Sequence, residues 1–187
     1  MRRHLSLATT LTALAALLLL CGGCDDDPAS PTEPDGGYGL LRSGMVYDFS
    51  RGIEAERDSL PHDLELQLSQ SGSCNGDSCD IYLTLTLATP PGGRIIDLGL
   101  AAMSAVEWLP DAGYVTELVW SDAGRIPYYS TDAALDGISD DCVDHTFVVI
   151  DPDGNEYLMT VLDAPLWSGG SYWNWDACLE FVWRRFP

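Results

Sequence analysis

Residues 173–184 read WNWDACLEFVWR, and every second side chain from Trp173 to Trp183 is apolar. The intervening positions are mostly polar, as at Asn174 and Glu180. Successive side chains of a β-strand point to opposite faces, so this period of two is typical of a strand with one buried face. The stretch therefore predicts a C-terminal strand that contributes an aromatic stripe to a core.

The same strand-like character recurs along the chain. Six further stretches show it: 45–50, 64–68, 81–87, 114–120, 146–150 and 156–162. The last two flank Asp153-Gly154, which favours a tight hairpin because glycine accepts a positive φ. Only residues 101–108 have a helical pattern. Many short strands separated by turns predict an all-β, antiparallel sandwich or open sheet pair with one short helix.

The N-terminus has the layout of a secretory signal. A basic start at residues 1–4 precedes an apolar run over residues 5–20, which is short for a transmembrane helix. The run ends in Gly22-Gly23-Cys24, which resembles a lipobox because small residues precede the cysteine. We expect cleavage before Cys24 and lipid on this residue; the alternative is an ordinary signal that yields a soluble product.

The expected organisation has three parts. Residues 1–23 form the lipoprotein signal peptide, and residues 24–37 form a disordered acidic and proline-containing tether with little to bury. Residues 38–187 are long enough for one β domain with its own core. Acylated Cys24 attaches the chain to a lipid bilayer of the cell envelope, for which we expect the outer membrane, with the periplasmic or surface face left open.

The charge of the chain is strongly acidic. It holds 29 acidic and nine basic residues, all nine of them arginine, for a formal net charge of −20. Such a field repels phosphate backbones, so we expect no nucleic-acid partner. It could favour cations or basic partners, but a solvated acidic surface is the simpler interpretation.

Four cysteines follow the proposed anchor. An exported protein meets an oxidising compartment, so two disulfides are expected. Cys74 and Cys79 bracket a turn-forming Asn-Gly-Asp-Ser sequence, and we favour their pairing together with a Cys142–Cys178 bond. A zinc site is the alternative, although these four cysteines show no Cys-x-x-Cys spacing.

Motifs of catalysis and metal binding are weak. No nucleophile elbow, zinc-protease motif, P-loop or dinucleotide-binding glycine pattern occurs, and only His62 and His145 follow the signal. We expect a non-enzymatic protein without a metal site; a hydrolase using two carboxylates is a further alternative. The acidic loops 136–144 and 151–155 are candidates for calcium, but a solvated loop and ordinary turn chemistry explain them more simply.

The order of several motifs resembles the HmuY-like envelope lipoproteins, an all-β family in which some members bind haem. A first-strand motif, VYDFSRG, is followed by HDLEL where the family usually has Trp-Asp. A passage with Val, Pro and Gly-Tyr comes next, and then a late hairpin with an aromatic closing strand. These motifs lie at residues 46–52, 62–66, 104–114 and 145–157.

This resemblance implies a haem site in the excursion between the Gly-Tyr strand and the late hairpin, where haem-binding members carry His or Met ligands. In this chain residues 120–144 contain neither His nor Met. Tyr128 and Tyr129 are then the candidate haem ligands, because tyrosinate can hold ferric haem. The implied function is haem binding or haem acquisition.

Outside that pair, the candidate aromatics are Trp108, Trp120 and a cluster near the C-terminus. Trp167, Tyr172, Trp173 and Trp175 surround a Ser-Gly-Gly-Ser sequence, although the last two also continue the apolar stripe and are interpreted as core. Exposed aromatics suit a porphyrin, a sugar or a peptide. The leading hypothesis is a membrane-anchored haem-binding lipoprotein, and the alternative is an envelope module that binds a protein or a glycan without haem.

Overall fold

The computed structural model describes residues 35–59, 61–127, 141–168 and 175–187. Within these residues the chain forms β-strands, one short 3-10 turn, η1 (Met103–Ala105), and two helical residues at 141–142. The strands are β1 (Gly36–Arg42), β2 (Met45–Asp48), β3 (Ile53–Glu56), β4 (Leu64–Asn75), β5 (Ser78–Ala88), β6 (Arg94–Asp97), β7 (Glu117–Pro127), β8 (Thr146–Ile150), β9 (Glu156–Asp163), β10 (Leu166–Ser168) and β11 (Trp175–Arg185).

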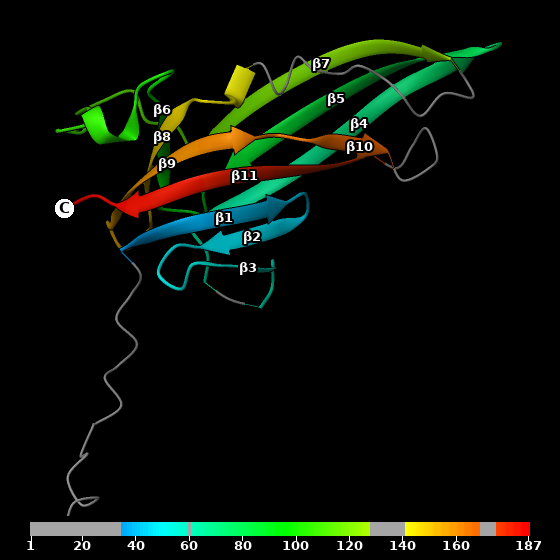
Figure 1. Cartoon of the computed structure of the whole chain (residues 1–187). Coiled ribbons are helices and arrows are strands. Elements are labelled where there is room, and N and C mark those ends of the chain that lie inside the picture. Colours follow the sequence, from blue (N-terminus) through cyan, green and yellow to red (C-terminus); the bar gives the residue numbers. More distant parts are fainter. Residues whose placement is uncertain (1–34, 60, 128–140, 169–174) are drawn as a thin grey trace, which may run out of the picture. The chain divides into compact units, whose positions relative to one another are not determined.

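The strands form two antiparallel sheets, which confirms the predicted fold class (Figure 1). One sheet, here the β11 sheet, has the order β1-β11-β9-β8-β6, with β10 paired to the start of β11. The other, here the β5 sheet, has the order β3-β2-β4-β5-β7. An isolated bridge between Ile95 and Val115 connects β6 to the segment that leads into β7.

The main core lies between the sheets because alternation along each strand turns one apolar face inward. On β11 the buried residues Trp175, Ala177, Leu179, Phe181 and Trp183 form the predicted stripe, although Trp173 lies outside the described residues. On β5 the inward set is the odd-numbered series from Cys79 to Leu87. The two periodic stretches therefore supply opposite walls of one core.

Aromatic packing joins the two walls. The Phe49 ring stacks on Tyr157 at a centroid distance of 4.7 Å, and Tyr47 meets Phe181 edge to face at 5.0 Å. The indole Nε1 of Trp183 donates to the hydroxyl oxygen of Tyr47 at 3.1 Å. This bond satisfies two polar atoms that would otherwise be costly to bury.

A smaller apolar cluster covers the outer face of the β11 sheet. Val148, Ile150 and Leu158 point outward from β8 and β9 and are buried by the segment between β6 and β7, through Leu98, Val106 and Tyr114 among others. The predicted helix over residues 101–108 is wrong: the structure has only the 3-10 turn η1, with no side-chain N-cap. So short a segment cannot offset the cost of helix nucleation, and its apolar residues serve as a cover instead. No membrane-spanning helix occurs among the described residues.

The β8–β9 connection is the predicted tight turn. Gly154 has φ +88, which the hairpin requires. The backbone and side-chain nitrogens of Asn155 donate to the two carboxylate oxygens of Asp151 at 2.7 and 2.6 Å. Turn chemistry thus accounts for this acidic motif, which the sequence also offered as a calcium candidate.

The cysteines follow the prediction only in part. Cys74 and Cys79 face each other across the β4–β5 ladder and form a disulfide. The predicted Cys142–Cys178 bond is wrong, since both residues are buried thiols. Cys142 packs in the main core, whereas Cys178 alternates with the inward residues Ala177 and Leu179 and so points to the opposite face of the β11 sheet.

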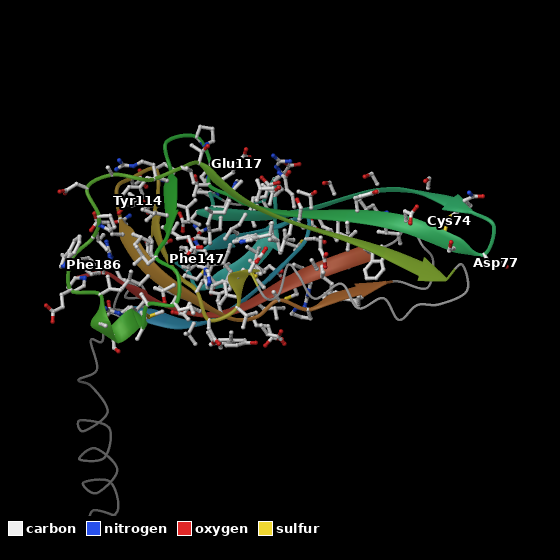
Figure 2. The ribbon with its side chains drawn as sticks, turned by 90° about the horizontal axis from the view of Figure 1, so that it is seen from above. Cys74, Asp77, Tyr114, Glu117, Phe147 and Phe186 are labelled. Carbon is white, nitrogen blue, oxygen red and sulfur yellow. A yellow bond between two sulfur atoms is a disulfide. The ribbon has the colours of Figure 1, made fainter. Side chains whose placement is uncertain are left out.

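Strands β4, β5 and β7 form a long three-stranded ribbon. The register runs from Ala88 opposite Glu65 and Glu117 to Ser78 opposite Asn75 and Pro127. Figure 2 shows Cys74 and Asp77 at the far end of this ribbon, with Glu117 and Tyr114 toward the other end. The end of the sandwich that carries the β4–β5 turn is termed the distal end below.

Candidate functional site

The end of β7 and the start of β11 lie on the same side of the sandwich, toward the distal end. The last residue of β7, Pro127, lies opposite Ser78 beside the β4–β5 turn. The backbone N–H of Trp175, the first residue of β11, donates to the side-chain oxygen of Gln70 on β4 at 3.3 Å. Gln70 pairs with Leu83 halfway along the ribbon, so β11 begins beside the middle of the ribbon, whereas β7 continues to the distal end (Figure 1).

The indole of Trp175 carries an unusual polar atom. The residue is only 9% exposed, and its Nε1 is buried without a hydrogen-bond acceptor among the described residues. A buried donor without a partner costs about 1–3 kcal/mol. A ligand or water that offers an oxygen at this position would recover that free energy.

The predicted haem ligands Tyr128 and Tyr129 lie outside the described residues, as do Tyr172 and Trp173. Tyr128 follows directly after Pro127, so the chain enters this pair from the distal end of β7. Trp120 is a core residue of the same strand: its ring meets Phe147 edge to face at 6.0 Å. The structure therefore assigns Trp120 and Trp175 to the core and leaves Trp167 partly exposed.

His145 is engaged by a neighbouring aspartate. The Nδ1 atom of His145 contacts an Asp97 carboxylate oxygen at 2.9 Å, and both side chains are half-buried. No group of three or more His, Cys, Asp or Glu side chains within the described ranges is arranged to hold a metal ion. Much of the acidic loop 136–144, the better calcium candidate, lies outside these ranges.

Asp63 is a buried carboxylate directly before β4. Asp63 accepts the backbone N–H of Phe49 through Oδ2 at 2.7 Å. Burial raises the pKa of Asp63 to about 7, the Phe49 hydrogen bond opposes the rise, and Asp151 and Asp48 add to it. Asp63 therefore titrates near neutral pH while it holds the Phe49 backbone in place.

A polar hollow opens beside the β1–β2 turn. Its volume is about 420 Å³, and its walls include Ser43, Arg57, Glu65 and Gln67. The Arg57 guanidinium contacts Glu65 at 3.1 Å, and Gln67 donates to the same carboxylate at 2.8 Å. The charges in this hollow are thus matched within the protein.

A smaller apolar hollow lies in the segment that covers the β11 sheet. Its volume is about 230 Å³, with Leu98, Val106, Trp108 and Pro110 among its walls. Trp108 is 74% exposed, and Leu100 nearby in the chain is equally exposed. The sequence offered Trp108 as an aromatic candidate, and the structure places it at the surface.

The outer face of the β5 sheet carries residues to which the sequence assigned no role. Tyr82 is 55% exposed on β5, and Val119 is 54% exposed on β7. The alternation that identified β5 also places Tyr82 outward, but alternation alone does not distinguish a plain solvent face from a binding surface. The residues beside Tyr82 on the neighbouring strands allow the two to be told apart, and only the strand register identifies them.

Comparisons with known proteins place few constraints on the site. No protein-family model and no curated protein matches the chain. Among solved structures the chain is similar to the "Apo HmuY analog (TFO)" of Tannerella forsythia, with 12% identity and a TM-score of 0.38, over 81% of this chain and 97% of that one. At these values the similarity transfers no ligand and no site residue to this chain.

Proposed function

We propose that this chain is a lipid-anchored, non-enzymatic binding protein of the bacterial envelope, and that its ligand site lies at the distal end of the sandwich. The observation that carries the site is the buried Nε1 of Trp175, which has no acceptor in the described part of the chain, at the start of β11 on the side of the sandwich toward the distal end. Binding sites commonly combine apolar walls with a few polar groups that fix orientation. Trp175 provides both in one side chain.

Haem is the first ligand to test at this end. Haem carries a flat apolar ring and charged propionate oxygens, so its chemistry suits an aromatic wall with an unused N–H donor. Residues 120–144 contain no His or Met, so we propose that tyrosine supplies the iron ligand. Tyr128 and Tyr129, which directly follow β7, are the proposed ligands, because tyrosinate holds ferric haem in other proteins.

The attachment to the membrane is proposed from the signal region. A lipid on Cys24 would join the β domain to the bilayer through a stretch that the sequence makes polar. Two or more acyl chains make such attachment stable. The outer membrane is the proposed location.

A haemin titration of the full lipidated chain in detergent tests the ligand, with detergent alone as the blank. We expect a saturable, one-to-one shift of the Soret band. Tyr128→Phe or Tyr129→Phe should weaken binding by roughly ten-fold or more through loss of the iron ligand. Tyr38→Phe, at an exposed tyrosine of β1, is the matched control and should leave the titration unchanged.

Two outcomes would contradict haem binding at Tyr128 or Tyr129. One is the absence of a saturable shift in a chain whose circular dichroism shows folded β-structure. The other is a shift that persists unchanged in the double variant Tyr128→Phe and Tyr129→Phe. After either result, a ligand other than haem would have to be sought for the distal end.

A further inference from the structure

The outer face of the β4–β5–β7 ribbon is a flat, three-by-three array of small or neutral side chains. The inward residues of β5 are the odd-numbered ones, so Tyr82, Thr84 and Thr86 point outward. The register places one residue of β4 and one of β7 beside each of them. The rows are Gln67-Thr86-Val119, Ser69-Thr84-Ser121 and Ser71-Tyr82-Ala123.

This neutral face contains no acidic or basic side chain, although the chain has 29 acidic residues and a net charge of −20. Charges resume at the next outward positions along the strands: Asp80, which lies opposite Arg125, at one end, and Glu117 together with Glu65, which is paired with Arg57, at the other. The net charge of the whole chain disfavours an anionic polymer. The nine positions hold no carboxylate that would bind a cationic one, so the face suits an uncharged partner.

The face presents serine and threonine hydroxyl groups around one aromatic ring, that of Tyr82. Each Ser or Thr hydroxyl offers one donor and two acceptor lone pairs, and Thr84 and Ser121 already approach each other at 3.3 Å across the strands. Tyr82 presents a large apolar ring with a polar tip. A protein interface needs a larger apolar centre with several aromatic or arginine anchors, which the nine residues lack.

We propose that this face binds a neutral polysaccharide, with Tyr82 stacking on a sugar ring and the serine and threonine hydroxyls contacting its hydroxyl groups. Two-residue steps along a strand are about 6.7 Å, so the three rows extend for about 13 Å along the ribbon. The small side chains keep this surface flat, which suits an extended chain of sugar rings. The face shares no residue with the proposed distal site.

The test uses the full lipidated chain in detergent and a panel of neutral polysaccharides: laminarin, mannan and galactomannan, with polygalacturonate as the anionic comparison. Binding is measured by isothermal titration calorimetry. We expect at least one neutral polysaccharide to bind saturably and polygalacturonate not to bind. Tyr82→Ala should weaken binding by roughly ten-fold, and Ser121→Asp should weaken it similarly by placing an acid in the central row.

Tyr38 provides a matched control. It is 56% exposed, against 55% for Tyr82, but lies on β1 of the other sheet. Tyr38→Ala should leave polysaccharide binding unchanged. The proposal is overturned if no neutral member of the panel binds, if Tyr82→Ala binds like wild type, or if both tyrosine variants lose binding equally. A chain that fails to bind haemin but passes this test retains the polysaccharide site.

Discussion

The buried carboxylate of Asp63 makes the stability of the fold depend on pH. It accepts the N–H of Phe49, whose ring stacks on Tyr157 in the centre of the core. Burial raises the pKa of this carboxyl to about 7. The folded state therefore keeps a proton on Asp63 that the unfolded state releases at lower pH.

This proton makes stability depend on pH in a defined direction. Because the folded-state pKa lies above the unfolded value, the free energy of unfolding should fall as pH rises from about 4 to about 7 and then level off. After allowance for solvent screening, the contribution is roughly 1–2 kcal/mol. Asp63→Asn keeps an oxygen for the Phe49 N–H but does not titrate, so its profile should be flatter.

Urea unfolding at several pH values between 4.5 and 8 measures the effect. Asp58→Asn, at an exposed aspartate, is the control and should retain the wild-type profile. If Asp63→Asn and wild type have parallel profiles, Asp63 does not hold its proton in the folded state.

At the scale of elements, the cysteines show how strand alternation decides pairing. Cys74 and Cys79 are cross-strand neighbours in one hairpin, so the ladder itself brings their sulfurs together. Cys142 and Cys178 lie on different faces of the β11 sheet, and both are buried. Burial raises the pKa of Cys142 to about 12 and that of Cys178 to about 11, which keeps both protonated and unreactive.

Alkylation with N-ethylmaleimide, read by peptide mass spectrometry, checks each cysteine separately. In the folded protein we expect no modification of Cys142 or Cys178. Denaturant without reductant should expose both to reaction, whereas Cys74 and Cys79 should react only after reduction. A requirement for reductant at Cys142 and Cys178 would show that they are oxidised in the protein.

At the scale of the whole molecule, the anchor determines where the β domain works. We expect Cys24→Ser to abolish incorporation of labelled palmitate and to leave unprocessed precursor, because the acyl acceptor is lost. Cys21→Ser is the matched control, since leucines rather than small residues precede Cys21, and it should be labelled and processed normally. Labelled palmitate on the Cys24→Ser chain would contradict the proposed anchor.

Much of the fold was predictable because it depends on local patterns. The alternation at β4, β5, β8, β9 and β11 predicted strands, and β8 matches the expected range of 146–150. Other strands carry little signal of their own: β6 and β10 are short, and β1 begins at Gly36, in glycines that read as part of the tether. These segments become strands because neighbouring strands pair with them, as Gly36 pairs with Arg184.

The sequence by itself determined the strand content, the tight β8–β9 turn and the Cys74–Cys79 hairpin, because each follows from residues close together in the chain. It also indicated that Trp175 belongs to the core, which the structure confirms. Only the tertiary structure decided that Trp120 is buried, that Cys142 and Cys178 face apart, and that nine neutral side chains share one face of a ribbon. These properties depend on strand order and register, which join residues that are distant in sequence, and no local pattern encodes that pairing.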